Sequence, residues 1–205
     1  MKVFLFISAA VVAYLIGGVN PAIVLSNRIY HQDIRQLGSG NPGFTNFKRV
    51  YGNRWAWFVF ALDIAKAVVV VGFFSMLFGS VLEMSQLGAA YTGFFAMIGH
   101  VFPIWYQFEG GKGFLVGAAT IFLVDWRVGL IALAIMMVLL FFTKYMSLSV
   151  IIAALSCPIA LASFGVHTPW TMVFCLLSVM LMVLRHRGNI ERLIKGTERK
   201  FSLKG

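Results

Sequence analysis

Seven apolar runs dominate this 205-residue sequence and constrain its fold more than any other feature. A helix needs about 20 apolar residues to cross the hydrocarbon core of a bilayer, and four or five of the runs are comfortably long enough. The fourth run, GFLVGAATIFLVD, is short and can cross only as a thin, protein-buried segment or with help from Ile104–Phe108. We therefore predict an all-α, polytopic membrane bundle with seven transmembrane helices, with six as the alternative. The runs are approximately residues 3–25, 55–79, 86–105, 113–125, 127–143, 147–165 and 169–185.

The composition supports a membrane protein. Hydrophobic residues make up 60% of the chain and charged residues only 12%, with a mean hydropathy of +0.87. Soluble domains carry about a quarter charged residues, so a soluble helical bundle is the weaker alternative. The chain shows no linker, repeat or second domain. We expect residues 1–205 to form a single transmembrane domain that ends in a short basic tail, residues 186–205.

The first apolar run could pass for a signal peptide, but no small-x-small cleavage site closes it. Gly17, Gly18, Asn20 and Pro21 instead predict close helix packing followed by a kink.

The placement of basic residues predicts the orientation in the membrane. Of the 17 lysines and arginines, fourteen fall in loops on one side of a seven-span topology, Lys66 lies within a span, and only Lys2 and Arg127 fall on the other side. The positive-inside rule then places the basic loops and the C-terminus in the cytoplasm and the N-terminus outside. The net charge of +10 therefore requires no nucleic acid, because topology and attraction to anionic lipid account for it.

The two cysteines and the four histidines predict no metal site. Cys157 and Cys175 lie inside predicted spans, which disfavours a disulfide framework or a thiolate nucleophile. No Cys/His spacing resembles a zinc site.

The first polar cluster on the basic side is the loop GSGNPGFTN, residues 38–46. Its GSGNPG matches the dinucleotide fingerprint G-x-G-x-x-G, but that motif requires a preceding strand, and this loop joins two membrane helices. Glycines at 38, 40 and 43 allow backbone amides to converge on an anion. The alternative is an ordinary flexible loop with topology charges. The neutral donors and cations around the glycines are Ser39, Asn41, Thr45, Asn46, Arg35, Lys48 and Arg49.

The second cluster is GHVFPIWYQFEGGKGF, residues 99–114. Glycines at 110, 111 and 113 flank Lys112 and leave the backbone N–H groups around it unshielded by side chains. Such a backbone nest is suited to bind an oxyanion or a phosphate. The spacing is not that of a P-loop. Glu109 is a candidate to orient Lys112, and His100 is as much a candidate for a structural as for a functional role.

The third cluster is RHRGNIERLIKGTERK, which begins at residue 185. His186 and Asn189 are three residues apart and share one helical face. A basic amphipathic helix on the membrane surface would explain the arginines but not this pair. Within the second span, Asp63 and Lys66 also share a face, and either a functional site or a self-neutralising structural pair explains them.

Together, GSGNPGFTNFKR, GHVFPIWYQFEGGKG and RHRGNIERL, in that order on one face, resemble the bacterial acyl-phosphate-dependent glycerol-3-phosphate acyltransferases. The resemblance covers almost the whole chain and includes the D-I-R before the first motif and the D-x-x-K of the second span. It implies a seven-span enzyme of the bacterial inner membrane with its active site facing the cytoplasm. Such an enzyme transfers a fatty acyl group from acyl phosphate to the sn-1 hydroxyl of glycerol 3-phosphate, which gives lysophosphatidic acid, and it uses neither acyl-CoA nor a bound cofactor.

The resemblance also implies residue roles. Lys112 would bind a phosphate, and His186 and Asn189 would hold the glycerol phosphate and its reacting hydroxyl. The phosphate-binding wall would include Ser39, Gly40, Asn41, Asn46, Arg49, Gly111 and Gly113. The partners would be the two substrates, membrane lipid and, transiently, the upstream enzyme that forms the acyl phosphate. The chain departs from the usual motifs at Phe44, at Ala67 and after GGKG, where it reads FLVG. The bulk of Phe44 and Phe114 bears on how the acyl donor fits and on substrate preference.

The acyl phosphate donor that the resemblance implies is already activated, and no Ser–His–Asp set is visible, so we expect a direct reaction without a covalent enzyme intermediate. The base would be His186 or a phosphate oxygen of a bound substrate. The main rival is a multi-span transporter of a phosphorylated solute, which would place broken or charged segments at the midplane of corresponding halves. A metal-dependent lipid phosphotransferase would need several aspartates on the basic face, which has almost none.

Overall fold

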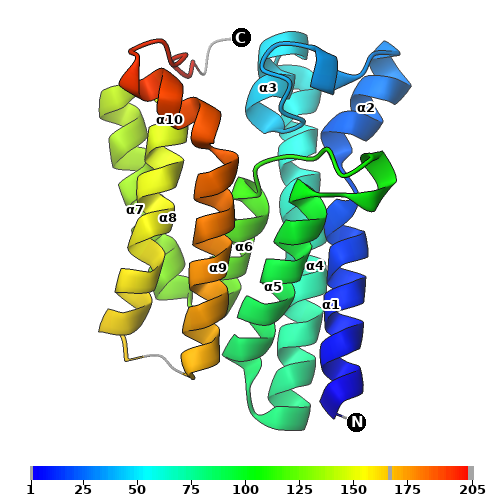
Figure 1. Ribbon diagram of the computed structural model, residues 1–205, viewed down its shortest axis with the longest axis vertical. Coiled ribbons are helices and arrows are strands. Elements are labelled where there is room, and N and C mark those ends of the chain that lie inside the picture. The colour runs from blue at the N-terminus through cyan, green and yellow to red at the C-terminus, as the bar shows by residue number, and fades with distance from the viewer. Residues whose placement is uncertain (1, 166–167, 203–205) are drawn as a thin grey trace.

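The computed structural model describes residues 2–165 and 168–202, and within these ranges the chain is all-helical (Figure 1), which confirms the predicted fold class. In chain order the elements are α1 (Lys2–Gly18), α2 (Pro21–Tyr30), the 3-10 helix η1 (Ile34–Gln36), α3 (Phe44–Tyr51), α4 (Asn53–Leu82), α5 (Ser85–Val101), the 3-10 helix η2 (Ile104–Tyr106), α6 (Phe114–Val124), α7 (Trp126–Thr143), α8 (Met146–Ser163), α9 (Pro169–Arg185) and α10 (Arg187–Ile194).

Each predicted apolar run forms a helix, but the helices differ in length. Within the described ranges, five helical segments are long and apolar enough to cross a membrane, and a sixth is added if α9 and α10, bent by 57°, count as one span. Helix α6 is apolar but only eleven residues long. The seven-span count and the orientation of the termini therefore stay predictions.

The helices form two groups joined through α6. On one side α1, α4 and α5 pack together, on the other α7, α8 and α9, and α6 lies between them (Figure 1). Helix α5 is central, since it contacts α1, α4, α6 and α9.

Small residues allow α1 and α5 to approach closely. A Cβ on Gly99 would lie 2.0 Å from the carbonyl oxygen of Tyr14, and a Cβ on Gly17 would lie 2.2 Å from that of Ala96. Without a hydrophobic driving force between helices in lipid, such close backbone contact is a main source of packing energy. The predicted packing role of Gly17 is thus confirmed.

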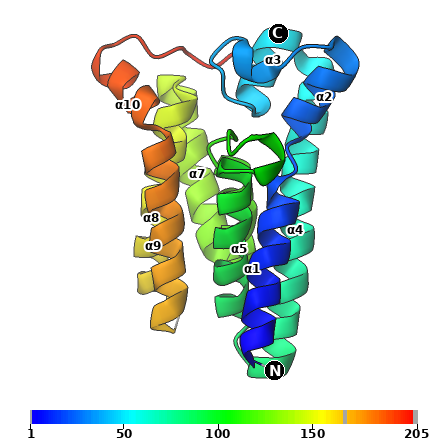
Figure 2. The same ribbon diagram turned by 45° about the vertical axis from the view of Figure 1, so that its right-hand side comes forward.

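The predicted kink lies between α1 and α2. The side chain of Asn20 accepts a hydrogen bond from the backbone N–H of Ile23, at 3.1 Å, and so caps α2, while Pro21 occupies the first helical position. Beyond the kink, α2, α3 and α10 gather at one end of the molecule, opposite the N-terminus (Figures 1 and 2). All three polar clusters lie toward this end, which we call the basic end.

The α1–α5 contact yields a stability prediction. We expect Gly99→Ala to cost about 1–3 kcal/mol, because the added methyl meets backbone that cannot move aside. The measurement is thermal unfolding of the purified protein in detergent. Gly72→Ala in α4 is the matched control: no atom lies within 4 Å of its added methyl, so it should be neutral or stabilise by up to about 1 kcal/mol. Equal melting temperatures for the two variants would contradict this account.

Candidate active site

The first glycine loop is held in shape by Asn46. Its side-chain oxygen accepts from the backbone N–H of Ser39 at 2.8 Å, and its amide nitrogen donates to the carbonyl of Leu37 at 2.9 Å. Gly38 and Gly40 have φ values of 63° and 73°, a left-handed conformation that glycine adopts without strain. Asn46 is 1% exposed, so its side chain is better placed to stabilise the loop conformation than to contact a substrate.

Two of the three glycine amides of this loop donate to nearby carbonyls. The N–H of Gly40 donates to the carbonyl of Leu37, and the N–H of Gly43 donates to that of Asn41. Side chains, rather than converging amides, are therefore what this loop presents to an anion. Ser39 and Arg49 are exposed, and Asn41 is partly so.

The second glycine loop packs directly on the end of α5. The N–H groups of Gly110 and Gly111 donate to the carbonyls of Val101 and His100, at 3.1 and 3.0 Å. A Cβ on Gly110 would lie 2.1 Å from the His100 carbonyl oxygen, and one on Gly111 would lie 2.2 Å from the ring Nε2 of His100. These two glycines are thus required by close packing, and their amides do not form the bare nest that the sequence predicts.

Lys112 follows these glycines and projects to the third cluster. Its ammonium donates to the side-chain oxygen of Asn189. Gly113, with φ 83°, precedes α6, so Lys112 also lies beside the positive end of that helix, where the first amides lack partners within the helix. Burial, and next the charge of Arg192, lower the pKa of Lys112 to about 8, although Glu198 opposes the shift.

Glu198 connects the third cluster to its neighbours. Its carboxylate accepts hydrogen bonds from Asn189 at 2.6 Å, from the Ser147 hydroxyl at 2.7 Å and from Arg192 Nε at 2.7 Å. Partial burial raises the pKa of Glu198, but these bonds outweigh it and the pKa is lowered overall. Arg49 is near enough to interact electrostatically with Glu198 and Lys112. The result is a cationic cluster with one carboxylate at its centre.

His186 lies at the junction of α9 and α10 and is 5% exposed. Its Nδ1 lies 2.8 Å from the Met182 carbonyl, which assigns the proton to Nδ1 and leaves Nε2 as an acceptor. Burial lowers the pKa of His186 to about 4, against an opposing effect of the bond to Met182. The imidazole is therefore neutral at physiological pH.

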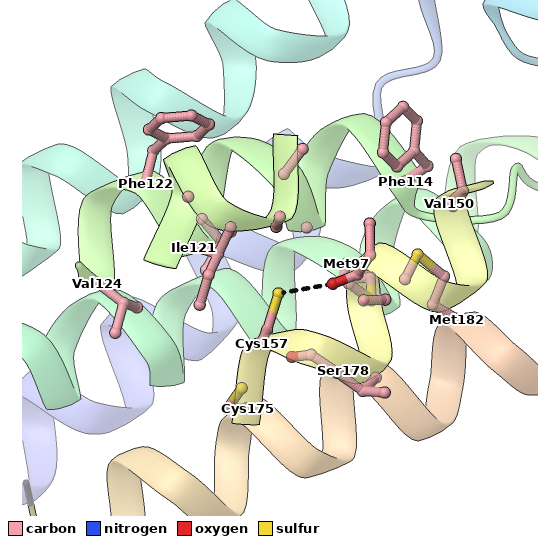
Figure 3. Close-up of a pocket in the computed structure, with 18 of the residues that line it drawn as sticks. Met97, Phe114, Ile121, Phe122, Val124, Val150, Cys157, Cys175, Ser178 and Met182 are labelled. Atoms are coloured by element: carbon pink, nitrogen blue, oxygen red, sulfur yellow. Dashed lines mark hydrogen bonds between the residues drawn. The ribbon is translucent and has the colours of Figure 1, made fainter. Parts of the chain in front are cut away.

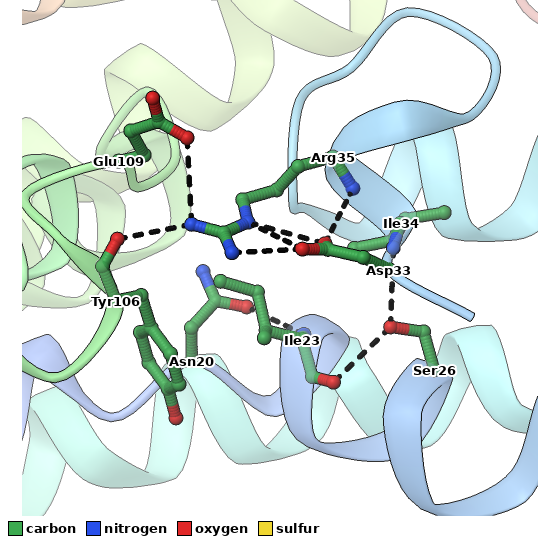
Figure 4. A network of polar contacts seen from close by, with 8 residues as sticks. All are labelled: Asn20, Ile23, Ser26, Asp33, Ile34, Arg35, Tyr106 and Glu109. Carbon is green, nitrogen blue, oxygen red and sulfur yellow. Dashed lines mark hydrogen bonds and ion pairs between the residues drawn. The ribbon is translucent and has the colours of Figure 1, made fainter. Parts of the chain in front are cut away.

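The two glycine loops meet at a polar pocket of about 250 Å³. Arg35 anchors its wall: the guanidinium pairs with Asp33 at 2.7 Å, donates to the Tyr106 carbonyl at 2.9 Å and reaches Glu109 at 3.5 Å (Figure 4). Glu109 thus pairs with Arg35, whereas the carboxylate in the Lys112 cluster belongs to Glu198. The pocket is lined by Arg35, Gly40, Pro42, Phe108, Glu109, Gly110 and Arg185.

An apolar pocket of about 110 Å³ begins next to the charged cluster and lies among α5 to α9 (Figure 3). It runs along α6 from Phe114, two residues after Lys112, to Val124. Eleven helical residues span about 16 Å. Met182, whose carbonyl contacts His186, also lines it, as do the buried free thiols of Cys157 and Cys175.

The structure thus joins Lys112 to Asn189, places Arg49 within electrostatic range of Lys112, and puts His186 one helical turn from Asn189. Ser147 and Glu198, which bond to each other in this cluster, were not predicted from the sequence. Glu198 had a faint signal, since it is one of two acidic residues in a basic tail. Ser147 had none, because serine is common in membrane helices.

Comparison with known proteins agrees with this arrangement. The family described as glycerol-3-phosphate acyltransferase matches residues 7–196. A glycerol-3-phosphate acyltransferase of Thermoanaerobacter pseudethanolicus is 40% identical over 195 residues, covering 95% of each chain. One of Staphylococcus carnosus is 39% identical over 193 residues, covering 92% of this chain and 94% of the relative.

Two crystal structures of PlsY (YgiH), an integral membrane glycerol 3-phosphate acyltransferase, have the same fold. The glycerol 3-phosphate form superposes with a TM-score of 0.87 at 27% identity, covering 96% of both chains. The lysophosphatidic acid form gives 0.83 at 26% identity, covering 96% of this chain and 95% of that one. The family match and the relatives at about 40% identity decide the assignment: the chain belongs to the glycerol-3-phosphate acyltransferase family and is an integral membrane acyltransferase.

Proposed function

We propose that this protein transfers a fatty acyl group from acyl phosphate to the sn-1 hydroxyl of glycerol 3-phosphate, which gives lysophosphatidic acid and phosphate. One observation carries the proposal: the cationic cluster of Lys112, Arg49 and Arg192 adjoins an apolar pocket whose lining starts at Phe114, two residues after Lys112. The phosphate groups of the substrates require the cationic cluster, and the fatty acyl chain requires the apolar pocket. The acyl phosphate would come from the enzyme that forms it, in a transient encounter at the membrane.

The proposed setting is the bacterial inner membrane, with seven spans, the N-terminus outside and the basic end in the cytoplasm. The gathering of the three basic motifs at one end of the molecule supports this orientation. Helix α6 is short for a span, but α4, α5 and α7 pack around it, and a protein-buried segment needs less length than a lipid-exposed one.

Phosphate binding would fall to side chains from all three motifs. Lys112 and Arg49 supply positive charge, and Ser39 and Asn41 supply neutral donors from the exposed face of the first loop. Gly113 and the first turn of α6 add backbone amides. Asn46, Gly40 and Gly111 would act by shaping the two loops.

The reaction needs no covalent enzyme intermediate. The sn-1 oxygen attacks the carbonyl carbon of the acyl phosphate, a new C–O ester bond forms, and the bond from that carbon to the phosphate oxygen breaks, with inorganic phosphate leaving. Alignment of the two substrates can supply about 7–11 kcal/mol of the barrier. The cationic cluster offsets the repulsion between two anions in a partly buried site.

The proton of the sn-1 hydroxyl must leave during the attack. With a pKa of about 4, His186 is a weak base but a good hydrogen-bond acceptor through Nε2. A phosphate monoester oxygen, with a second pKa near 6, is the stronger base. We therefore assign the orientation of the hydroxyl to His186 and Asn189, and proton transfer to a phosphate oxygen of a bound substrate.

The deciding assay uses purified protein, acyl phosphate and glycerol 3-phosphate, with lysophosphatidic acid and released phosphate as the products measured. We expect Lys112→Ala to lower turnover by at least about 100-fold, as loss of a charged donor at a reacting centre does. Lys195→Ala, at an exposed tail position, is the control and should keep full turnover. An active Lys112→Ala would overturn the site assignment, and equal use of acyl-CoA would overturn the donor.

A pH profile tests the state of Lys112. The ammonium binds phosphate only when protonated, so above about pH 6, where the phosphate base is ionised, kcat/KM for glycerol 3-phosphate should be full and should then fall as pH rises through about 8. Lys112→Arg keeps its charge throughout this range, so its residual activity should show no fall near pH 8. An identical fall in both proteins would place the titrating group elsewhere.

The apolar pocket yields a test of chain-length selection. Ala154 lines the pocket, and Leu155, its neighbour on α8, is exposed on the outer face. We expect Ala154→Phe to lower kcat/KM for hexadecanoyl phosphate relative to decanoyl phosphate by about tenfold, since it fills space that a long chain needs. Leu155→Phe should leave the ratio unchanged. An unchanged ratio in Ala154→Phe would show that the chain lies elsewhere.

A further inference from the structure

Three ionisable side chains lie buried beneath the second glycine loop and are not used by the proposed reaction. Asp63 and Lys66 come from α4 and His100 from the end of α5. Their side chains are only 1%, 9% and 6% exposed. Burying charges in this way costs free energy, and apolar residues of similar size often stabilise a fold as well or better. Stability alone therefore does not explain why these three ionisable residues are present.

The ammonium of Lys66 joins three separate parts of the chain. It lies 2.7 Å from Asp63 Oδ1, donates to the backbone carbonyl of Val19 at 2.6 Å, and lies 3.0 Å from Nδ1 of His100. An ammonium can only donate, so Nδ1 of His100 accepts and its Nε2 carries the proton. A pair that served only to neutralise charge would need the contact with Asp63 but neither of the other two.

The contact with Val19 leads to the first glycine loop. Val19 precedes Asn20, whose amide nitrogen donates to the Pro42 carbonyl at 3.0 Å. Asn20 is fully buried and caps α2 with its other amide atom. The kink between α1 and α2 is thus bonded to Lys66 on one side and to the loop GSGNPGFTN on the other.

The contact with His100 leads to the second loop. The carbonyl of His100 accepts from Gly111, and its ring Nε2 lies against the space above that glycine. A shift of the ring would therefore displace Gly111 and the adjacent Lys112. A continuous chain of contacts runs from Pro42 through Asn20, Lys66 and His100 to Lys112.

We propose that Lys66 is a positioning residue, whose buried ammonium holds the two glycine loops in register so that Lys112 reaches Asn189. Asp63 compensates its charge, and His100 transmits its position to Gly111. The inference rests on the proposed role of Lys112, and it gives a reason for an ion pair inside the bundle that the proposed reaction does not use.

The first test is the double variant Asp63→Leu/Lys66→Met, which removes both charges and keeps the volumes similar. We expect it to unfold at a temperature close to that of the wild type, because no charge is left unpaired. Its kcat/KM should nevertheless fall by about 10- to 100-fold, as small misplacements of reacting groups cause. A folded double variant with wild-type activity would overturn the proposal.

A second readout does not depend on the acyl donor. The rate at which acetic anhydride modifies Lys112 in the substrate-free protein, measured by mass spectrometry, should rise severalfold in the double variant because the loop no longer holds the amine. An unchanged rate would overturn the proposal. If the wild-type protein forms no lysophosphatidic acid from acyl phosphate, the proposed acyl donor is wrong. The labelling rate still reports the position of Lys112 in that case, so the two proposals are tested separately.

A matched pair at His100 covers the case in which the double variant does not fold. His100→Asn keeps an acceptor at the place of Nδ1, whereas His100→Leu removes it. We expect the labelling rate of Lys112 to stay within about twofold of the wild type in His100→Asn, by retention of the bond to Lys66, and to rise severalfold in His100→Leu. Equal labelling and equal activity in the two variants would overturn the proposal.

Discussion

Gly110 and Gly111 donate their N–H groups to the carbonyls of Val101 and His100, and the position of the chemistry follows from this contact. Gly110 and Gly111 are buried away from water, so their backbone amides must find partners within the protein. The loop after α5 does so by packing on the end of that helix, which only glycine permits at these distances. Lys112 is thereby presented at the basic end, immediately before α6.

Two environments meet at that point. On one side lie several cations and the Glu198 carboxylate, and on the other an apolar pocket that follows α6 into the bundle. The reaction of an anionic headgroup with a fatty acyl chain requires both environments within the length of one small molecule. Because Lys112 and Phe114 are two residues apart, a single loop-to-helix transition supplies the boundary between them.

Much of the fold and part of the site could be predicted. The helices follow from runs of apolar residues, and the kink follows from Asn20 and Pro21, because these signals act over a few neighbouring residues. The motifs predicted Lys112, Asn189 and Arg49 as site residues, and the structure brings them to one charged cluster, while their roles stay predictions. The roles of the glycines and of Asn46 were harder, since the same small or polar residues can bind an anion or close a loop. Ser147 and Glu198 were missed because their contacts join positions 51 and 9 residues apart along the chain.

By itself, the sequence determined a helical membrane protein, the grouping of its basic residues on one face and the family to which its motifs point. These depend on hydrophobicity, charge and short patterns, which are properties of local segments. Only the tertiary structure decided that Gly110 and Gly111 donate their amides to the end of α5, that Glu198 joins Lys112 through Asn189, and that Lys66 connects the α1–α2 kink with His100. Several of those contacts form between residues far apart in the sequence. They depend on how the helices pack in three dimensions, which short sequence patterns do not specify.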